Sequence, residues 1–349
     1  MPIGERIAIY RRRRGLTQLV LAGLIGRSES WLSQVERGIR PIDRLSVLID
    51  IAHVLKVNVT DLTGQPFSLA PNGGFENNVI HAIRHALTRY DAIPAILDPA
   101  HDKHAAAPDV ASLQRHLQRA WQLRQAARYS ELGAVLPRLM ADTERATREL
   151  EGIDRLAAFA VLTETYHVTA MALKKFGANE LAWIAADRSV LAAERAEAPL
   201  LMAVSARAVG QVFMSAGRLE EADSVSAAAL TALEPRLGNP SPEHLSVWGA
   251  LLLTRAMIAA RKNDRPTARQ FIRDAQAIAG RLGQDRNDFW TIFGPTNVAI
   301  HAVSVDVELG DPAAGLQGAE RRPVSALAGV GRAARLPHDR CGAGLRPAT

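Results

Sequence analysis

Residues 15–38 have the sequence GLTQLVLAGLIGRSESWLSQVERG, and this stretch decides the fold of the N-terminal part of the chain. Thr17 and Ser28 are typical N-cap residues, whose side-chain oxygens accept hydrogen bonds from the first turn of a helix. Gly26 stands between the two expected helices, where a tight turn often needs a positive φ. Gly38 ends the second helix. The spacing predicts two short helices joined by a tight turn.

Further helices are expected on both sides of this pair, which gives five short helices within residues 1–64. Asp43 opens the fourth helix, and residues 59–62 form a last helical turn. The helical spacing of apolar residues predicts the inner positions. These are Ile3, Ile7, Ala8 and Tyr10 in the first helix, Leu19, Ala22 and Leu24 or Ile25 in the second, Leu32 and Val35 in the third, and Leu45, Leu48, Ile49, Ala52 and Leu55 in the fourth.

The third expected helix has a composition suited to reading DNA bases. Its N-terminal positions carry short polar side chains that reach base edges when a helix lies in the major groove. A glutamine at the start of the second helix can donate to a phosphate, and nearby arginines can neutralise phosphates. Residues 1–62 hold ten basic and six acidic side chains, so most of the chain's net charge of +6 lies there. The predicted DNA-binding residues are Gln18, Arg27, Ser28, Glu29, Ser30, Ser33, Gln34, Arg37 and Arg40.

Three features of the same segment have simpler interpretations. Trp31 is expected to pack at the rim of the domain rather than to read bases. Glu36 is expected to have a structural role. The run Arg11–Arg14 either adds DNA contacts or, as charge runs usually do, forms a solvated face.

The segment resembles the lambda-repressor-like (Cro-type, XRE) helix-turn-helix family over residues 3–64. The match follows the runs Gly15–Gln18, Leu21-Ala22, Gly26, Ser28–Gly38 and Leu55–Leu62. The resemblance implies a five-helix domain that binds double-stranded DNA, with Gln18, Ser28, Glu29, Ser30, Ser33 and Gln34 facing it. Glu29 departs from the pattern, since many members carry an uncharged amide or hydroxyl there. A glutamate accepts from cytosine N4 but repels phosphate, which leaves the base preference open.

Residues 65–111 are expected to be a connector with one helix at about 75–90, flanked by glycines and prolines. His81 and His85 lie four residues apart on that helix, and His101 and His104 follow. Four histidines can bind a metal. No acidic ligand cluster accompanies them, so surface or packing histidines are favoured, and no metal is expected.

Residues 112–316 are predicted to form an α-solenoid, and the chain as a whole to be all-α. Turn signals recur at Gly177, Gly217, Asp264 and Gly310, and each interval holds two amphipathic helices. Each such hairpin leaves an apolar face that only its neighbour covers.

The repeats resemble tetratricopeptide-like hairpins, most clearly over residues 208–222, where small residues allow close helix approach. Together, the two parts resemble regulators of high-GC actinobacteria that join an XRE-type domain to degenerate tetratricopeptide repeats. That resemblance implies that the repeats dimerise or sense an effector, without naming a ligand.

One segment of the solenoid, residues 287–297, joins three aromatic residues to polar amides and breaks at a Gly-Pro pair. It is either a ligand-contact patch, with Asp288, Trp290 and Asn297 as contacts, or a helix entry with core aromatics and a proline kink. The second interpretation is favoured.

Residues 317–349 break the helical pattern, since residues 318–349 hold eight Gly or Pro, six Arg and only two acidic residues. Disorder is expected there. The helix that ends at Gly310 is expected to be followed by the second helix of another repeat, but the helical pattern stops there. A frameshift near residue 317 is therefore an alternative origin for this tail.

The remaining observations limit the function classes. A single cysteine, Cys341, excludes a disulfide framework and a cysteine-based zinc site, and no signal peptide or membrane span is evident. No phosphate-binding loop, cofactor motif or nucleophile–base pair can be named, so an enzyme is not expected. We predict a cytoplasmic, nucleoid-associated, sequence-specific transcription regulator, dimeric, whose repeats sense a peptide, a small molecule or a protein. The alternative is a protein-interaction scaffold with nonspecific DNA affinity.

Overall fold

The computed structural model describes residues 2–42, 45–55, 57, 62, 73–88, 109–234 and 238–311. The chain divides into two compact units, residues 1–73 and 74–349, which are described separately. The predicted tail over 317–349, His101 and His104 lie outside the described residues.

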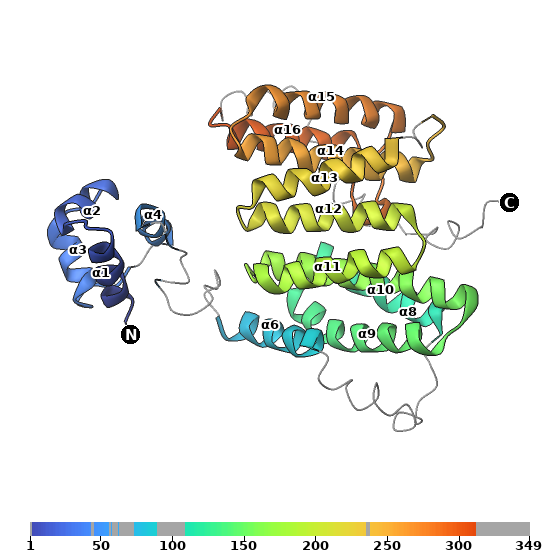
Figure 1. Cartoon of the computed structure of the whole chain (residues 1–349), viewed down its shortest axis with the longest axis horizontal. Helices are drawn as coiled ribbons and strands as arrows, with labels where there is room; N and C mark the ends of the chain where they lie inside the picture. The colour runs from blue at the N-terminus through green and yellow to red at the C-terminus, as the bar shows by residue number, and fades with distance from the viewer. Residues whose placement is uncertain are drawn as a thin grey trace. The chain divides into compact units, whose positions relative to one another are not determined.

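Four described helices build the N-terminal unit (Figure 1): α1 (Ile3–Arg13), α2 (Gln18–Leu24), α3 (Glu29–Glu36) and α4 (Leu45–Leu55). Of the predicted fifth helical turn at 59–62, only Leu62 lies within the described residues, and it is fully buried. The core joins all four helices through Ile7, Leu21, Leu32, Val35, Leu48, Ile51 and Leu55.

The inner face of α2 differs from the prediction. Leu19 was expected inside, together with either Leu24 or Ile25, but Leu19 and Leu24 are 63% and 61% exposed. The inward face is centred on Leu21, Ala22 and Ile25. Because successive helix residues turn by about 100°, Leu19 and Leu24 fall on either side of that face.

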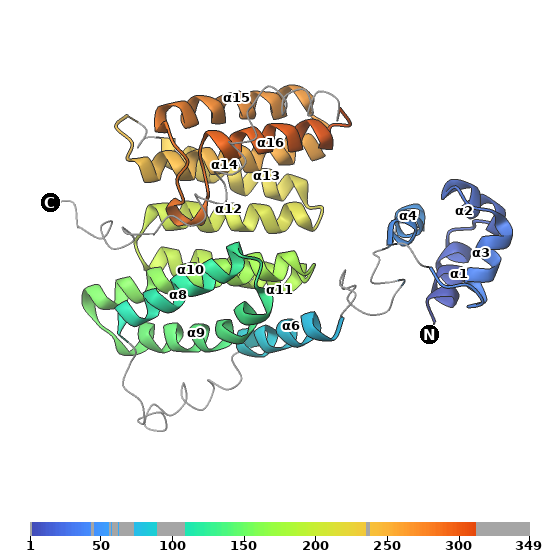
Figure 2. The same ribbon diagram turned by 180° about the vertical axis from the view of Figure 1, so that it is seen from behind.

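The second unit consists of helical hairpins after a first helix, α6 (Gly73–Thr88) (Figures 1 and 2). The repeat helices are α8 (Val110–Gln125), α9 (Tyr129–Glu149), α10 (Gly152–Lys175), α11 (Asn179–Arg195), α12 (Pro199–Ser215), α13 (Leu219–Leu233), α14 (Pro242–Arg261), α15 (Arg265–Leu282) and α16 (Pro295–Glu308). A short 3₁₀ helix, η3 (Asp288–Trp290), lies in the loop before α16. The helical solenoid is confirmed.

The helices stack in two rows, as a solenoid requires. Each even-numbered helix from α8 to α16 contacts the next even-numbered helix, while the odd-numbered helices join their chain neighbours. The predicted turns fall between paired helices, at Gly177, Gly217 and Asn263-Asp264. Gly177 and Gly217 have φ values of 71° and 77°, in the left-handed region that glycine enters without strain.

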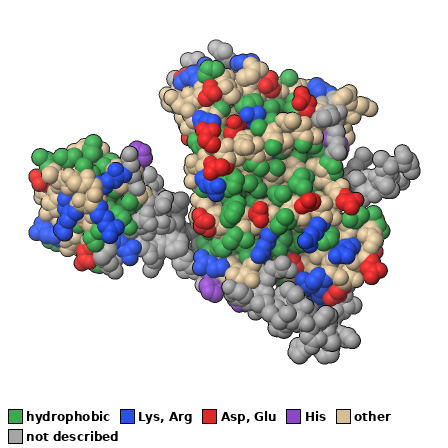
Figure 3. Space-filling view, viewed as in Figure 1, with side chains coloured by type: hydrophobic (Ala, Val, Ile, Leu, Met, Phe, Trp, Pro, Cys, Tyr) green, Lys and Arg blue, Asp and Glu red, His purple; other side chains and the backbone are tan. Residues whose placement is uncertain are grey.

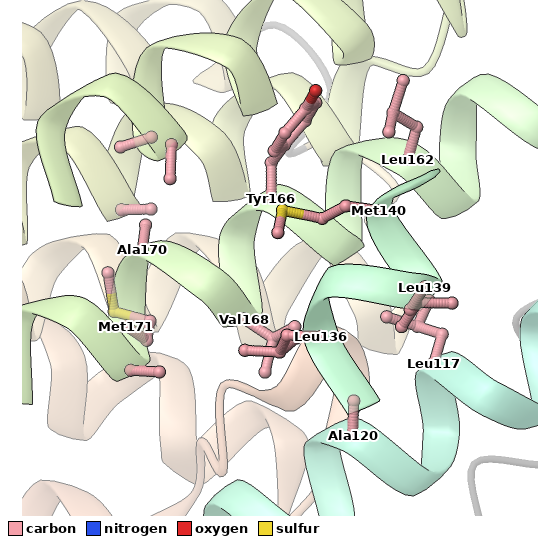
Figure 4. Close-up of a cluster of buried hydrophobic side chains, with 14 of the residues drawn as sticks. Leu117, Ala120, Leu136, Leu139, Met140, Leu162, Tyr166, Val168, Ala170 and Met171 are labelled. Carbon is pink, nitrogen blue, oxygen red and sulfur yellow. The ribbon is translucent and has the colours of Figure 1, made fainter. Parts of the chain in front are cut away.

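Two hydrophobic clusters form the core of the repeats. The first spans α6 to α12, and Figure 4 shows part of it, including Leu136, Met140, Tyr166 and Val168. The second spans α12 to α16 and surrounds the fully buried Phe293. Val79, Ile83 and Leu87 of α6 belong to the first cluster, so this helix packs on the repeats.

One helix, α10, is long and apolar enough to cross a membrane by length and composition alone. Its most apolar window is 83% buried inside the protein, however, and it packs against α8, α9, α11 and α12. Its hydrophobicity is therefore that of a central core helix.

Candidate nucleic-acid interface

The turn between α2 and α3 is built as the sequence predicts. Thr17 Oγ1 accepts from the backbone N–H of Val20 at 3.2 Å, which caps α2. Ser28 Oγ accepts from the backbone N–H of Trp31 at 3.2 Å, which caps α3. Gly26 lies between them with a φ of 64°. These contacts fix where α3 starts and therefore which side chains its first turn presents.

The first turn of α3 points into solvent. Ser28, Glu29 and Ser30 are exposed, and Ser33 and Gln34 are half-buried further along the helix. Leu32 and Val35, on the opposite face, are 0% and 1% exposed and anchor the helix in the core. The predicted short polar side chains thus share one accessible helix surface.

The three arginines predicted to contact phosphates lie close to the two ends of this helix. Arg27, Arg37 and Arg40 are all exposed. The Arg27 guanidinium lies 5.6 Å from the centre of the Trp31 ring, and Arg37 Nε donates to the Ser33 carbonyl at 3.2 Å. Figure 3 shows that basic side chains outnumber acidic ones on the visible face of this unit. Trp31 itself is half-buried and packs on the core.

A buried polar network holds α3 against α1 and α2. Arg11 donates from Nε to Glu36 Oε1 at 2.6 Å and from Nη2 to Glu36 Oε2 at 2.9 Å. Gln18 Nε2 donates to the same Oε2 at 2.7 Å. Glu36 therefore has the structural role expected of it, and Gln18 is already engaged inside the domain.

The network sets the charge state of its members. Burial alone would raise the pKa of Glu36, but hydrogen bonds from Arg11 and Gln18 hold that pKa below its ordinary value. The hydrogen bond to Glu36 raises the pKa of Arg11. Both side chains are therefore charged at neutral pH.

The arginine run is not a uniform solvated face, and sequence reasoning missed two of its members. Arg11 is 8% exposed and belongs to the network above. Arg14 Nε donates to the Leu55 carbonyl at the end of α4, at 2.9 Å. The helical register of Arg11, which shares a face with Ile7, was the available signal for its burial.

The second predicted site, around residues 288–297, is occupied by internal contacts. Asp288 accepts from Ser246 Oγ at 2.6 Å and from Arg286 Nε at 2.6 Å. Trp290 is 8% exposed and donates from Nε1 to Glu164 Oε2 at 3.0 Å. Asn297 is half-buried on α16, where its carbonyl contacts His301 Nδ1 at 3.0 Å.

Metal ligands do not assemble among the described residues. His81 and His85 are exposed on α6, and the described part of the chain contains no group of three or more His, Cys, Asp or Glu side chains placed to hold a metal ion.

Comparison with known proteins identifies the N-terminal unit. The family model of a helix-turn-helix domain matches residues 2–63. The matched segment contains the turn between α2 and α3, and the helical repeats follow it in the chain. Over 86 residues the chain is 29% identical to the HTH-type transcriptional regulator SinR of Bacillus subtilis (strain 168), covering 25% of this chain and 78% of SinR.

Two solved structures are similar to a larger part of the chain. BtubC (BKLC) from P. vanneervenii matches with a TM-score of 0.44 at 14% identity, covering 80% of this chain and 99% of that one. PlcR of Bacillus thuringiensis, solved in complex with the peptide PapR7 and DNA, matches with a TM-score of 0.35 at 16% identity, covering 80% and 95%. Scores below 0.5 do not establish a common overall fold.

Proposed function

We propose that the protein controls transcription by binding specific double-stranded DNA through α3, as a homodimer, while its repeats sense a peptide, a small molecule or a protein. The observation that carries the proposal is the exposed first turn of α3, with Ser28, Glu29 and Ser30 between arginines at both helix ends. Such a regulator acts in the cytoplasm, at the nucleoid.

The side chains of α3 have distinct roles in this proposal. Ser28, Glu29, Ser30, Ser33 and Gln34 contact base edges in the major groove. Glu29 has no donor and accepts from cytosine N4, so a cytosine is expected opposite it.

The flanking groups position the domain on the DNA backbone. Arg27, Arg37 and Arg40 neutralise phosphates, which adds affinity without sequence preference. Gln18 remains in the proposed set, because an amide has two N–H donors and its contact with Glu36 leaves one for a phosphate.

Dimerisation would present two copies of α3 to one face of the DNA. In helix-turn-helix dimers, half-sites lie about one turn apart, ~34 Å. The operator is therefore expected to be palindromic with half-site centres at that spacing. A monomer bound to a single, asymmetric site would contradict this part of the proposal.

The first experiment is to sequence DNA fragments retained by the purified full chain and to measure affinity for the enriched site. Replacing Ser30 or Gln34 by alanine should weaken specific binding by about 1–3 kcal/mol. The matched control is Arg138→Ala on α9, a side chain that is 88% exposed and far along the chain from α3. Unchanged operator affinity in both variants would contradict the role of α3.

A salt titration separates positioning contacts from base contacts. Arg40→Ala should weaken binding to the enriched site and to random DNA alike, and should reduce the salt slope by about one. Ser30→Ala should leave the slope unchanged, since it removes no phosphate contact. A protein without preference for the enriched site over random DNA would refute sequence-specific regulation.

A further inference from the structure

Three basic side chains of the even-numbered helix row lie together without an acidic partner. They are Arg124 on α8, Lys174 on α10 and Arg207 on α12, and all three are half-buried. Within the described part of the chain, none of them forms an ion pair with an acidic side chain or a side-chain hydrogen bond. Arg207 Nε is fully shielded from solvent and has no hydrogen-bond partner.

The three charges affect one another and a common neighbour. Burial, followed by the charges of Arg207, Arg124 and Lys174, lowers the pKa of His167 well below its ordinary value. Burial and the charges of Arg124 and Arg207 lower the pKa of Lys174 to about 8. All three cations are therefore within electrostatic reach of one imidazole.

Two further ring nitrogens close to these cations lack hydrogen-bond partners. Among the residues that the structure describes, Trp121 Nε1 and His167 Nδ1 find no partner, although the two residues are only 1% and 2% exposed. Their rings meet edge to face with centres 4.9 Å apart, and the Arg124 guanidinium lies 5.3 Å from the centre of the Trp121 ring. Leaving a buried donor unsatisfied is unfavourable, so an acceptor is expected to bind at Trp121 Nε1.

The buried carboxyl group of Glu164 does not neutralise this group of cations. Glu164, one helical turn before His167, accepts from Trp290, and burial raises its pKa to about 7. It is therefore only partly ionised at neutral pH. His301 on α16 is neutral at pH 7, because burial, and to a smaller extent the charge of Arg207, lowers its pKa.

The ring that stacks on Trp121 belongs to a loop with strained backbone. Trp290 stacks on Trp121 with ring centres 5.3 Å apart and an angle of 10° between the planes. Phe289, Trp290 and Ile292 all have left-handed φ values, of 47°, 59° and 49°. Such strain in non-glycine residues persists only where surrounding contacts impose it, and it is concentrated at ligand-binding sites.

We propose that this group, made up of Trp121, Arg124, His167, Lys174 and Arg207, binds a small anionic ligand through its carboxylate or phosphate oxygens. Buried cations without counter-ions are strongly disfavoured, and an anion would remove that cost while accepting from Trp121 Nε1 and Arg207 Nε. Because the group holds three cations, a ligand with at least two negative charges would balance their charge best. The inference rests on the sensing role proposed for the repeats and gives its effector a chemical class.

The test uses the full chain and two probes, inorganic phosphate and citrate, each against sodium chloride of equal ionic strength. At about one hundred times its dissociation constant, a ligand that binds only the folded state should raise the Tm by at least ~3 °C. A larger effect of phosphate identifies a phosphorylated ligand, and a larger effect of citrate a polycarboxylate. No rise with either probe overturns the proposal.

Variants locate the site. Arg207→Gln and Lys174→Gln should each weaken binding of the effective probe at least ~10-fold. The matched control is Arg195→Gln, in a groove of about 400 Å³ between α9, α10 and α11 that is lined by four arginines, Arg148, Arg155, Arg188 and Arg195. Loss of binding in Arg195→Gln, with binding kept in Arg207→Gln, would place the anion in the other groove and refute this site.

A measurement without ligand tests the charge argument itself. In phosphate-free and citrate-free buffer, Arg207→Gln should raise the Tm, because it removes one of three mutually repelling cations. A lowered Tm together with unchanged probe binding would show that the chain itself satisfies Arg207. These outcomes are independent of DNA binding. If the chain binds its operator but neither anion, only the anion site is contradicted. If the chain binds an anion but no specific DNA, only the proposed role in transcription is contradicted.

Discussion

Arg11 of α1 and Glu36 of α3 form a buried, two-pronged ion pair, with nitrogen–oxygen distances of 2.6 and 2.9 Å across 25 residues of sequence. The pair joins the first helix directly to the end of the helix that carries the proposed DNA-reading residues. Gln18 adds a third hydrogen bond to the same carboxylate. The orientation of α3 therefore depends on a charge that is not itself in the DNA-facing set.

Removing one member of this pair should destabilise the N-terminal unit. Glu36→Gln leaves the Arg11 charge buried and unmatched, which should cost ~3 kcal/mol. Hydrogen exchange of the α1 and α3 amides, followed by mass spectrometry on the full chain, reports this loss locally. The double variant Arg11→Met, Glu36→Met should recover much of it, since no isolated charge remains. Equal protection in wild type and Glu36→Gln would contradict the role of the pair.

The same carboxylate gives the N-terminal unit an acid-sensitive component. The pKa of Glu36 is lower in the folded state than its ordinary value of 4.5, so the unfolded state binds the proton more readily. The stabilisation is thus complete above about pH 4.5 and is lost as the pH falls through the lower, folded-state pKa. Exchange protection of α1 and α3 measured between pH 6 and 3 should show this loss. Glu36→Gln is the control, and an identical pH profile in that variant would exclude Glu36 as the source.

Two glycines of the N-terminal unit should respond oppositely to alanine. A Cβ at Gly4 would lie 2.1 Å from the Val35 carbonyl oxygen, which is backbone and cannot move aside cheaply. Gly4→Ala should destabilise the unit by ~1–3 kcal/mol. Gly23, inside α2, has nothing within 4 Å of such a Cβ, and Gly23→Ala should stabilise it by up to ~1 kcal/mol. Chemical unfolding of both variants, monitored by exchange, checks the signs, and a stabilising Gly4→Ala would refute the close approach of α1 and α3.

A second pair of glycines tests the packing of the loop before α16. A Cβ at Gly249 on α14 would lie 1.9 Å from Phe293 Cζ, whereas one at Gly280 on α15 would meet nothing within 4 Å. Gly249→Ala should lower the stability of the repeats by ~1–3 kcal/mol, and Gly280→Ala should not lower it. Thermal unfolding of the full chain measures both. If the double variant Gly249→Ala, Phe293→Leu is no more stable than Gly249→Ala, the clash is not the cause.

Local signals in the sequence predicted the helix boundaries and the presentation of α3. Thr17, Gly26 and Ser28 act through bonds to residues at most three positions away, so their roles can be read from spacing alone. The same is true of the turns that divide the repeats, such as Gly177 and Gly217.

Contacts between distant residues were not predictable from one sequence. The hydrogen bond from Gln18 to Glu36, across 18 residues of sequence, was not foreseen beside the predicted phosphate contact of Gln18. Trp290 was a candidate ligand contact, but its partner Glu164 lies 126 residues away. Arg124, Lys174 and Arg207 are each ordinary helix residues in the sequence, and only the stacking of α8, α10 and α12 brings their charges together.

The loop that carries Trp290 and Phe293 also bears on how the repeats are made. A chain of hairpins that touch only their neighbours can fold in order, as each hairpin leaves the ribosome. Here Trp290 joins the hydrophobic cluster of α6 to α12, and Phe293 joins that of α12 to α16. The Trp121 ring and the Glu164 carboxylate lie in the early hairpins, but both contact Trp290, which is synthesised 126 residues after Glu164. Until Trp290 has been synthesised, a newly made chain exposes the Trp121 ring surface that Trp290 covers in the folded protein. The packing of the early hairpins is therefore completed only when the loop before α16 has folded against them.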